Sequence, residues 1–423
     1  MARAKYRLCH FRAYGKTRPP PRPPPGEYCM SLPLIALFLA AFAFGTAEFV
    51  IAGILPEVAT GLGVTVPVAG YLISGYAIGI AVGGPLLAVA TKKMTRKSLI
   101  LLLGGIFTLG QVLCAIAPSF ELLMAARVIV AVVHGTYFGI AAIVAVSLVP
   151  PEKRGFAVAL ILSGLTVSNI LGVPGGTAIG NVLGWRATFW TVGIIGLLAT
   201  LTVAFFLPRG AASATTAGDF AREFKVLGRQ QIVASLLIVI LVMIGQYSLF
   251  TYITPLLTNI TGLPTATVPW LLLLYGVGST IGVFVGGRLA DWKLMPSLIA
   301  ILTLQAVMFA TIFFVSPYAI VMAIATILWG GVNFAFGSPV QSRVLAWAAD
   351  APNLASALIP TGFNIGIAIG AILGANVIAS GPGYAYLPLI GAISSALAAF
   401  VAIVSNMLDK RQGLLPPVAI AAE

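Results

Sequence analysis

One carboxylate of this chain, Glu48, lies deep inside an apolar stretch of membrane length. The stretch runs over residues 32–55 and carries no other charged residue. A charged carboxylate at the centre of a membrane helix costs at least ~2.5–3.5 kcal/mol, and burial favours its neutral, protonated form. A group that is neutral in hydrocarbon and ionised when water reaches it can carry a proton. Glu48 therefore predicts a proton-transfer step within the membrane.

A second charge, Arg127, lies inside the apolar stretch 119–147. Arginine cannot lose its charge, so it needs acceptors or a water-filled cavity. His134 follows seven residues later, nearly two helical turns on, and so shares a face with Arg127. Placed near Glu48, Arg127 would favour the ionised carboxylate, so that cavity water would decide its state. The alternative is a structural polar lock between helices, and for His134 a neutral, hydrogen-bonded ring.

Composition identifies lipid as the solvent of the segments that carry these groups. Of 423 residues, 59% are hydrophobic and 8% are charged, and the mean hydropathy is +1.04. Soluble domains carry about 25% charged residues. The cysteines Cys9, Cys29 and Cys114 show neither metal-ligand spacing nor a disulfide framework. We therefore expect an all-α membrane protein with no metal site and no cofactor.

Apolar runs of about 20 residues predict twelve transmembrane helices, each long enough to cross a hydrocarbon layer of ~30 Å. We place them at residues 32–55, 68–90, 98–117, 119–147, 156–180, 187–208, 230–258, 267–289, 296–315, 318–343, 354–379 and 385–408. Short turns at 117–119 and 316–318 divide runs that would otherwise have double length.

The domain boundaries follow from these spans. Residues 30–208 form a first six-helix half, 209–229 a linker, 230–411 a second six-helix half and 412–423 a tail. Residues 1–29 are basic and proline-rich and cannot bury a core. They are either a disordered segment or an extension ahead of a true start at Met30, and we assign them no function.

Basic residues give the orientation, because loops on the cytoplasmic side are enriched in Lys and Arg. One side carries Arg186, whereas the side of the N-terminus carries Lys92, Lys93, Arg96, Lys97, Lys153, Arg154, Arg209, Arg222, Lys225, Arg229, Arg288, Lys293, Arg343, Lys410 and Arg411. Both termini are therefore expected in the cytoplasm. The net charge of +13 is a topology signal rather than a sign of nucleic-acid binding.

The chain also repeats itself. Gly164, Gly172 and Gly176 of the fifth span align at one constant offset with Gly362, Gly370 and Gly374 of the eleventh. Two pseudo-symmetric halves related by an axis along the membrane normal are a transporter architecture, with the substrate bound where the halves meet.

Several motifs resemble the major facilitator superfamily over residues 30–410. Residues 287–291, Gly287-Arg288-Leu289-Ala290-Asp291, match the family's G-x-L-A-D loop motif after the eighth span, whereas Lys92 occupies the Asp position of the corresponding loop in the first half. Arg127, in RVIVAVVHG, resembles an arginine of the fourth span that the family associates with proton coupling. The fifth span, with Gly164, Gly172, Pro174 and Gly176, resembles the glycine-proline signature of antiporters in a variant form.

The opening GTAEFVIAGILPEVA and the element GWRATFW are most similar to bacterial twelve-span drug:proton antiporters, in the branch of arabinose, purine and chloramphenicol exporters. The resemblance implies a monomer of the bacterial inner membrane that exports a small organic molecule in exchange for protons by alternating access. Glycines four apart and a helix-bending proline suit a pivot between the halves, and the same pattern is also common in ordinary packing of membrane helices.

In the family's arrangement, spans 1, 2, 4, 5, 7, 8, 10 and 11 face a central cavity. In this sequence they offer as substrate contacts Tyr71, Tyr76, Tyr137, Asn169, Gln246, Tyr247, Tyr252, Tyr275, Asn333, Gln341 and Asn364. Aromatic and amide side chains suit neutral or cationic amphiphiles. Within the membrane we expect no charge in the second half.

No enzyme signature is present, and no glycine loop for a nucleotide. Two alternatives to export stay open. A proton-coupled importer would use the same residues in the other direction, and a membrane sensor would not transport at all.

Overall fold

The structure is a computed structural model that describes residues 5–6, 27–28, 32–207, 228–348 and 350–411, without the side chains of 5–6, 27–28 and 352–357. The predictions for the N-terminal segment 1–29, the linker 209–229 and the tail 412–423 lie largely or wholly outside the described residues. Two short strands are the exception in the first of these: β1 (Lys5–Tyr6) and β2 (Glu27–Tyr28) pair in parallel.

Helices make up the membrane part of the first half. They are α1 (Leu32–Gly53), α2 (Leu55–Leu62), α3 (Val66–Ile78), η1 (Gly79–Gly83), α4 (Gly84–Ala90), α5 (Arg96–Ile116), α6 (Phe120–Ser147), η2 (Pro151–Lys153), α7 (Arg154–Val167), η3 (Ser168–Gly172), α8 (Val173–Leu183) and α9 (Trp185–Phe206).

The second half is also helical. Its elements are α11 (Gln230–Phe250), α12 (Ile253–Asn259), η5 (Thr265–Thr267), α13 (Val268–Val315), α14 (Ala319–Ala335), α15 (Gly337–Trp347), α16 (Pro352–Ala379), η6 (Tyr384–Tyr386) and α17 (Leu387–Arg411).

Twelve spans are present in the described part of the chain, as predicted. Eleven segments are long and apolar enough to cross a membrane, and one of them, Thr265–Val315, has twice the usual length. Its helix α13 is broken at Lys293, where φ is −152° and ψ is 93°. The Ser297 hydroxyl donates to the Leu289 carbonyl at 2.9 Å across this break, so the chain folds back and α13 supplies the eighth and ninth spans.

Capping residues mark the ends of several helices, and one of them lies in a predicted turn. Ser119, in the predicted turn 117–119, caps α6 by accepting a hydrogen bond from the Leu122 amide at 3.4 Å. Thr65 caps α3 in the same way, and Gly63 ends α2 in the left-handed conformation with φ 66°.

Two spans of the first half contain π-helical turns. They are η1 and η3, and each lies just before a proline, Pro85 and Pro174 respectively. A proline has no N–H and crowds the preceding turn, and a π turn relieves both constraints at the expense of a bend. The π turns were not predicted, although a bend at the proline of the fifth span was, and the equivalent spans in α13 and α16 show no π turn in their described residues.

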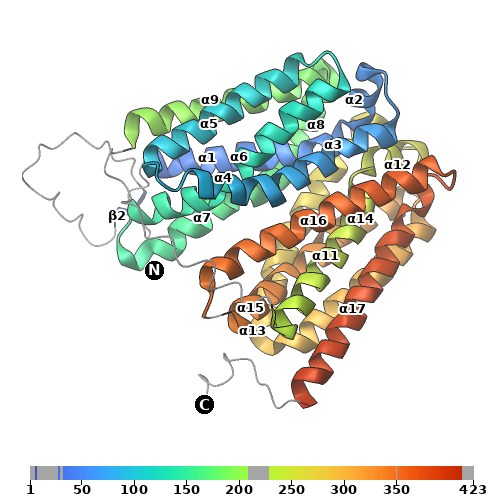
Figure 1. Cartoon of the computed structure of the whole chain (residues 1–423). Helices are drawn as coiled ribbons and strands as arrows, with labels where there is room; N and C mark the ends of the chain where they lie inside the picture. The colour runs from blue at the N-terminus through green and yellow to red at the C-terminus, as the bar shows by residue number, and fades with distance from the viewer. Residues whose placement is uncertain (1–4, 7–26, 29–31, 208–227, 349, 412–423) are drawn as a thin grey trace, which may run out of the picture.

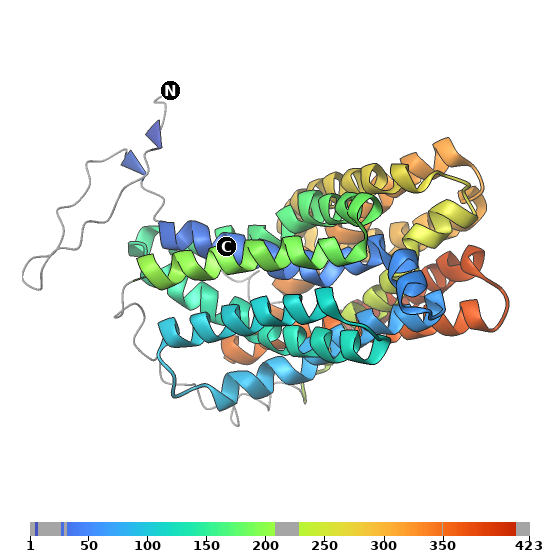
Figure 2. The same cartoon turned by 90° about the horizontal axis from the view of Figure 1, so that it is seen from above.

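Figure 1 shows the two halves as two lobes, α1–α9 in blue to green and α11–α17 in yellow to red, and Figure 2 gives the view from above. We call the end of the bundle where α4 ends and α5 begins the basic end. Lys97 donates to the Ala204 carbonyl there at 2.9 Å and so joins the start of α5 to the end of α9. The end that carries α2 and α12 is the opposite end.

The described hydrogen bonds between the halves lie toward the opposite end. The Ser74 hydroxyl of α3 donates to the Ala368 carbonyl of α16 at 3.2 Å, and the Thr254 hydroxyl of α12 donates to the Ala52 carbonyl of α1 at 2.9 Å. Close packing continues to mid-span, where a Cβ added at Gly276 of α13 would lie 2.8 Å from Ile170 Cα. The two halves are therefore tied together on one side of their midplane.

Of the two readings of the fifth-span glycines, their contacts favour ordinary helix packing over a pivot between the halves. A Cβ at Gly164 would lie 2.7 Å from the Cβ of Ala41, and Gly172 and Gly176 face Thr46 and Val50. All three partners belong to α1. These glycines therefore let the fifth span pack on the first within one half. The contact of this span with the second half runs through η3 and α8, both of which pack on α13.

Candidate functional site

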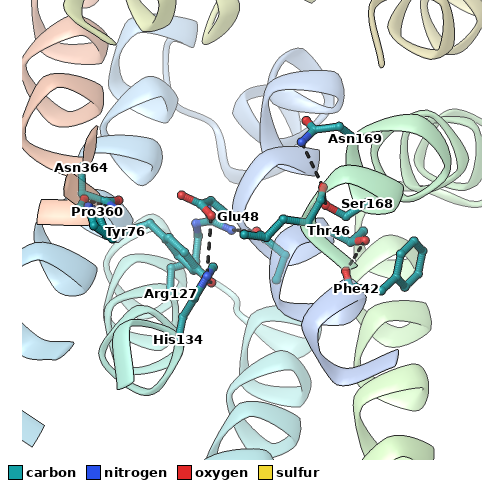
Figure 3. Close-up of polar contacts among 12 residues, drawn as sticks. Phe42, Thr46, Glu48, Tyr76, Arg127, His134, Ser168, Asn169, Pro360 and Asn364 are labelled. Atoms are coloured by element: carbon teal, nitrogen blue, oxygen red, sulfur yellow. Dashed lines mark hydrogen bonds and ion pairs between the residues drawn. The ribbon is translucent and has the colours of Figure 1, made fainter. Parts of the chain in front are cut away.

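Glu48 of α1 lies beside His134 of α6 in the centre of the first half (Figure 3). Its carboxylate Oε2 is 3.7 Å from His134 Nε2. On the far side of the imidazole, Nδ1 is 3.0 Å from the Tyr76 hydroxyl of α3. When Tyr76 donates to Nδ1, the ring proton is on Nε2 and points toward Glu48. Three helices thus align a carboxyl, an imidazole and a phenol in one row.

Arg127 stabilises its charge with the backbone of the neighbouring helices. Its Nε donates to the Leu72 carbonyl at 3.3 Å and its Nη1 to the Ala47 carbonyl at 3.1 Å. The guanidinium carbon lies 4.6 Å from the centre of the Tyr76 ring, in cation–π geometry. Among the described residues, Nη2 has no hydrogen-bond partner, and no ion pair within 4.0 Å joins Arg127 to Glu48.

The side chains of Glu48, His134 and Arg127 are all buried, so removal from water affects the free energy of their charged forms. The side chain of Glu48 is 12% exposed and that of His134 is 6% exposed, while Arg127 is 1% exposed. Removal from water favours the neutral carboxyl and the neutral imidazole. The nearby guanidinium favours the ionised carboxylate instead. Two opposite influences, burial and the charge of Arg127, therefore act on the carboxyl of Glu48.

A pocket opens beside Glu48 between the two halves. Its cavity volume is about 10 Å³, enough for about one water molecule. The residues that line it are Glu48, Phe49, Ala52, Ile73, Tyr76, Ala77, Tyr247, Phe250 and Ile367. They come from α1, α3, α11 and α16, so the pocket lies where the halves meet.

The structure places the predicted cavity residues in three different surroundings. Tyr76 and Tyr247 line the pocket. Asn169 and Tyr252 lie at the contact between the halves: the Asn169 carbonyl faces Gly276, and the Tyr252 ring packs against Gly70 of α3.

Five other predicted contacts are buried and bonded within one half, whereas Tyr71 is half-buried and Gln341 is exposed. The Tyr137 hydroxyl donates to the Leu37 carbonyl at 3.0 Å, and the Asn364 amide donates to the Pro360 carbonyl at 2.9 Å. Gln246 donates to the Tyr275 hydroxyl, and Asn333 accepts from Gln305.

The loop motif of the second half lies away from the pocket. Gly287 and Asp291 belong to the basic-end part of α13, and Asp291 is exposed. Motif residues Gly164, Gly172, Pro174 and Gly176 lie in the fifth span described above. The residues predicted to couple protons thus lie together, whereas the motif residues lie outside the lining of the pocket.

One charged group of the second half was not expected inside the bundle. Arg343 of α15 is 1% exposed and donates to Asp409 of α17 at 2.9 Å and to the Ser405 hydroxyl at 2.6 Å. Gln231 of α11 donates to the same carboxylate at 3.3 Å. The sequence signal is Asp409 at the end of a long apolar run, whereas the sequence analysis places Arg343 only at the end of the tenth span, among the residues that give the orientation.

The described residues contain no group of three or more His, Cys, Asp or Glu side chains that could hold a metal ion.

Comparison with known proteins gives the family. The sequence model of the Major Facilitator Superfamily matches residues 37–351 of this chain. The chain is 40% identical over 376 residues to the inner membrane transport protein YdhP of Escherichia coli K12, covering 89% of this chain and 96% of that protein. It is 35% identical over 351 residues to a chloramphenicol resistance protein of Streptomyces lividans, covering 82% and 90%.

Solved structures agree on the fold. A D-xylose–proton symporter superimposes with a TM-score of 0.72 at 16% identity, covering 88% of this chain and 96% of that chain. A bacterial homologue of the human lysosomal transporter Spinster, in an inward-facing and unoccupied conformation, gives 0.68 at 18% identity, covering 88% and 94%. Together with the match to the family description, these similarities show that the chain belongs to the Major Facilitator Superfamily and is a membrane transporter rather than an enzyme.

Proposed function

We propose that this chain is a proton-coupled exporter of a small organic molecule, with Glu48 as the proton carrier. The observation that supports this most is the position of Glu48, buried in line with His134 and Tyr76 and facing a pocket between the halves. Buried acids of membrane spans that face a cavity mark ion pathways.

The basic end is the cytoplasmic end in this proposal, and the membrane is the bacterial inner membrane. The positive-inside rule supports the orientation, and the 40% identical inner membrane transport protein supports the compartment. The hydrogen bonds of Ser74 and Thr254 then close the periplasmic side. The structure would correspond to the state that is open toward the cytoplasm.

The transport cycle follows from the competition at Glu48. In the cytoplasm-facing state, water reaches Glu48, the carboxyl releases its proton and the pocket accepts substrate. The halves then rock, the substrate leaves toward the periplasm and a proton from outside neutralises Glu48. Because the neutral carboxyl no longer needs water, the protonated carrier can return through the occluded state.

Export is favoured over import by two observations. The similarity to a chloramphenicol resistance protein covers 82% of this chain, and the fifth span carries the variant glycine-proline signature. The symporter of D-xylose shares only 16% identity, so its likeness supports the fold and not the direction.

Inside-out membrane vesicles test direction and substrate together. With an acidic lumen, vesicles that contain the protein should accumulate radiolabelled chloramphenicol, the first probe, and then sugars and nucleobases in turn. Vesicles from cells without the protein are the control. Accumulation of a compound in right-side-out vesicles, driven by protons entering with it, would replace the exporter with the importer.

A further inference from the structure

We propose that the basic end of the bundle closes through an ion pair between the lysines that follow α4, Lys92 and Lys93, and Asp350, which precedes α16. In the structure no ion pair of the described residues joins the two halves, and this pair forms when the halves rock toward each other at the basic end. The inference rests on the rocking of the halves in the proposed function and is independent of the substrate and of the direction of transport.

The hydrogen bond from Ser74 of α3 to Ala368 of α16 gives the register between the second and eleventh spans. The two spans are antiparallel: α3 leads through η1 and α4 to the basic end, whereas α16 starts at that end and leads toward η6, which packs on α12. Lys92 lies 18 residues after Ser74, and Asp350 lies 18 residues before Ala368. Eighteen helical residues make five turns and rise about 27 Å. Lys92 and Asp350 are therefore level along the bundle.

The local geometry preserves this match to within about one residue. A π turn closes its hydrogen bonds over one more residue than an α turn, so η1 moves the face of Ser74 from Lys92 toward Lys93, and both are basic. Each charged position also lies two residues beyond a helix end, since α4 ends at Ala90 and α16 begins at Pro352. The flexible four-carbon stem of a lysine can span the remaining offset.

Along the two facing spans, charge is confined to these positions. No Asp, Glu, Lys or Arg lies between Ser74 and Lys92, and none lies between Asp350 and Ala368. Lys92 and Lys93 are exposed, and none of the described residues forms an ion pair with either of them. Lys92 also stands where the family's loop motif has Asp, so the sign of the pair is a property of this chain and not of the motif.

Asp350 is held in place and still has room for a second base. Its two carboxylate oxygens accept hydrogen bonds at 2.7 Å from Arg229 of the same half. Arg229 also donates to the Trp347 carbonyl, which fixes the carboxylate just before α16. The side chain of Asp350 is nevertheless 60% exposed, and a carboxylate has about four lone-pair sites. A lysine can therefore join Asp350 without displacing Arg229.

The other described acids of the second half at this end belong to other contacts. Asp409 is bound within its own half. Asp291 lies on α13, which meets the fifth span where Gly276 faces Ile170. Asp291 follows Gly276 by 15 residues, and Arg154 precedes Ile170 by 16, so closure brings Asp291 to the level of Arg154. Among the described residues this leaves one acid opposite the end of α4.

Cysteine cross-linking tests whether the two positions meet. In full-length protein without native cysteines, reconstituted in proteoliposomes, Lys92→Cys or Lys93→Cys combined with Asp350→Cys should form a disulfide under mild oxidation. The control combines the same lysine variant with Arg411→Cys, because Arg411 is exposed at the same end but belongs to α17, which packs on α11 and α13. Equal yields from the test and control pairs, or no disulfide from either lysine position, would overturn the inference.

A charge swap tests whether the pair stabilises the closed state. Spin labels at Ser98→Cys in the first half and Ser342→Cys in the second, both exposed at the basic end, report the ratio of closed to open molecules through their distance. Lys92→Glu with Lys93→Glu should lower this ratio by about twofold or more, because an exposed attraction becomes a repulsion. Asp350→Lys alone should lower it in the same way, and the triple variant should recover it.

The comparison of Asp350→Lys with the triple variant isolates the contact between the halves. Both variants lose the bond to Arg229, so that loss cancels, and only the triple variant places opposite charges across the gap. Lys410→Gln, an exposed lysine of α17 at the same end, is the control and should leave the ratio unchanged. Equal ratios in Asp350→Lys and the triple variant would contradict the pair.

The label distances also separate this inference from the proposed function. A single, fixed distance in wild-type protein would contradict the rocking of the halves and the pair with it. Two populations that do not respond to the charge swap would contradict the pair and leave the exporter intact. Recovery in the triple variant, in a protein that moves neither protons nor chloramphenicol, would support the pair and contradict the exporter.

Discussion

At the scale of single residues, Glu48, Arg127 and His134 were identifiable because an ionisable group inside an apolar run is rare. The sequence also predicted that Arg127 and His134 share a helix face, and the structure brings both to the neighbourhood of Glu48. The bond from Tyr76 to His134 was not predictable, since one sequence does not fix the register between two helices. The roles of Glu48, Arg127 and His134 in proton coupling stay predictions.

Arg127 gives the first test at this scale. Arg127→Ala removes two donors to the Ala47 and Leu72 carbonyls and the charge beside Glu48, so proton-driven transport should fall by at least tenfold. Arg127→Lys should recover only part of it, because a single ammonium cannot reach both carbonyls and cover the Tyr76 ring. Transport rates in proteoliposomes, normalised to folded protein, provide the measurement. Wild-type rates in the alanine variant would reduce Arg127 to a packing residue.

At the scale of elements, the apolar runs and turn residues predicted the twelve spans closely, because both signals are local. The π turns before Pro85 and Pro174 and the buried pair of Arg343 with Asp409 were missed. Whether a helix bends at a proline depends on how the neighbouring helix packs against the bent segment. The burial of Arg343 depends on α11, α15 and α17 meeting, which no single run reveals.

Adjacent glycines of the fifth span provide a matched pair. A methyl group at Gly176 would lie 3.2 Å from Thr188 Cγ2 and closer still to Val50, whereas none of the described atoms lies within 4 Å of the same position at Gly175. Gly176→Ala should therefore force α8 away from α1 and lower the thermal stability of the protein in detergent. Gly175→Ala should be neutral or slightly stabilising. Equal melting temperatures for the two variants would contradict the close packing of this span.

The buried ion pair of Arg343 with Asp409 should contribute more to the stability of the protein than the exposed pair of Arg229 with Asp350. Asp409→Asn leaves the charge of Arg343 buried with a weaker partner, at a cost of up to ~3–5 kcal/mol. Asp350→Asn removes the exposed carboxylate that accepts two hydrogen bonds from Arg229 and should have a far smaller effect. Unfolding curves in detergent measure both, and similar losses would contradict the contrast in burial.

The pH dependence of the exposed pair has a definite sign. Hydrogen bonds from Arg229 hold the pKa of Asp350 below its ordinary value. The contribution of this pair is therefore complete above the unfolded pKa of about 4 and is lost as the pH falls through the lower folded value. Asp350→Asn should consequently match wild type in stability at low pH.

At the scale of the whole molecule, the internal repeat predicted two halves, and Figure 1 shows them as two lobes. The sequence could not predict at which end of the bundle the two halves are in contact, because the same sequence adopts every conformation of the transport cycle. In the structure the described hydrogen bonds between the halves lie toward the opposite end.

A cross-link between the halves tests this state. In a protein without native cysteines, Ser74→Cys combined with Ala368→Cys places two thiols where the Ser74 hydroxyl meets the Ala368 carbonyl. Oxidation should join them and stop transport, and reduction should restore it, whereas either single variant should be insensitive to oxidant. Full transport by the oxidised, cross-linked protein would show that this end need not open.

The central claim is that Glu48 carries the proton that drives transport. Its most direct test measures, in the same proteoliposomes, internal pH with a trapped dye and the flux of a substrate found in the vesicle screen. In wild type, substrate movement should drive a matching proton movement in the opposite direction. Glu48→Gln, folded and inserted to the same level, should move no protons and concentrate no substrate under a pH gradient. Coupled proton and substrate movement in the Glu48→Gln protein would contradict the account.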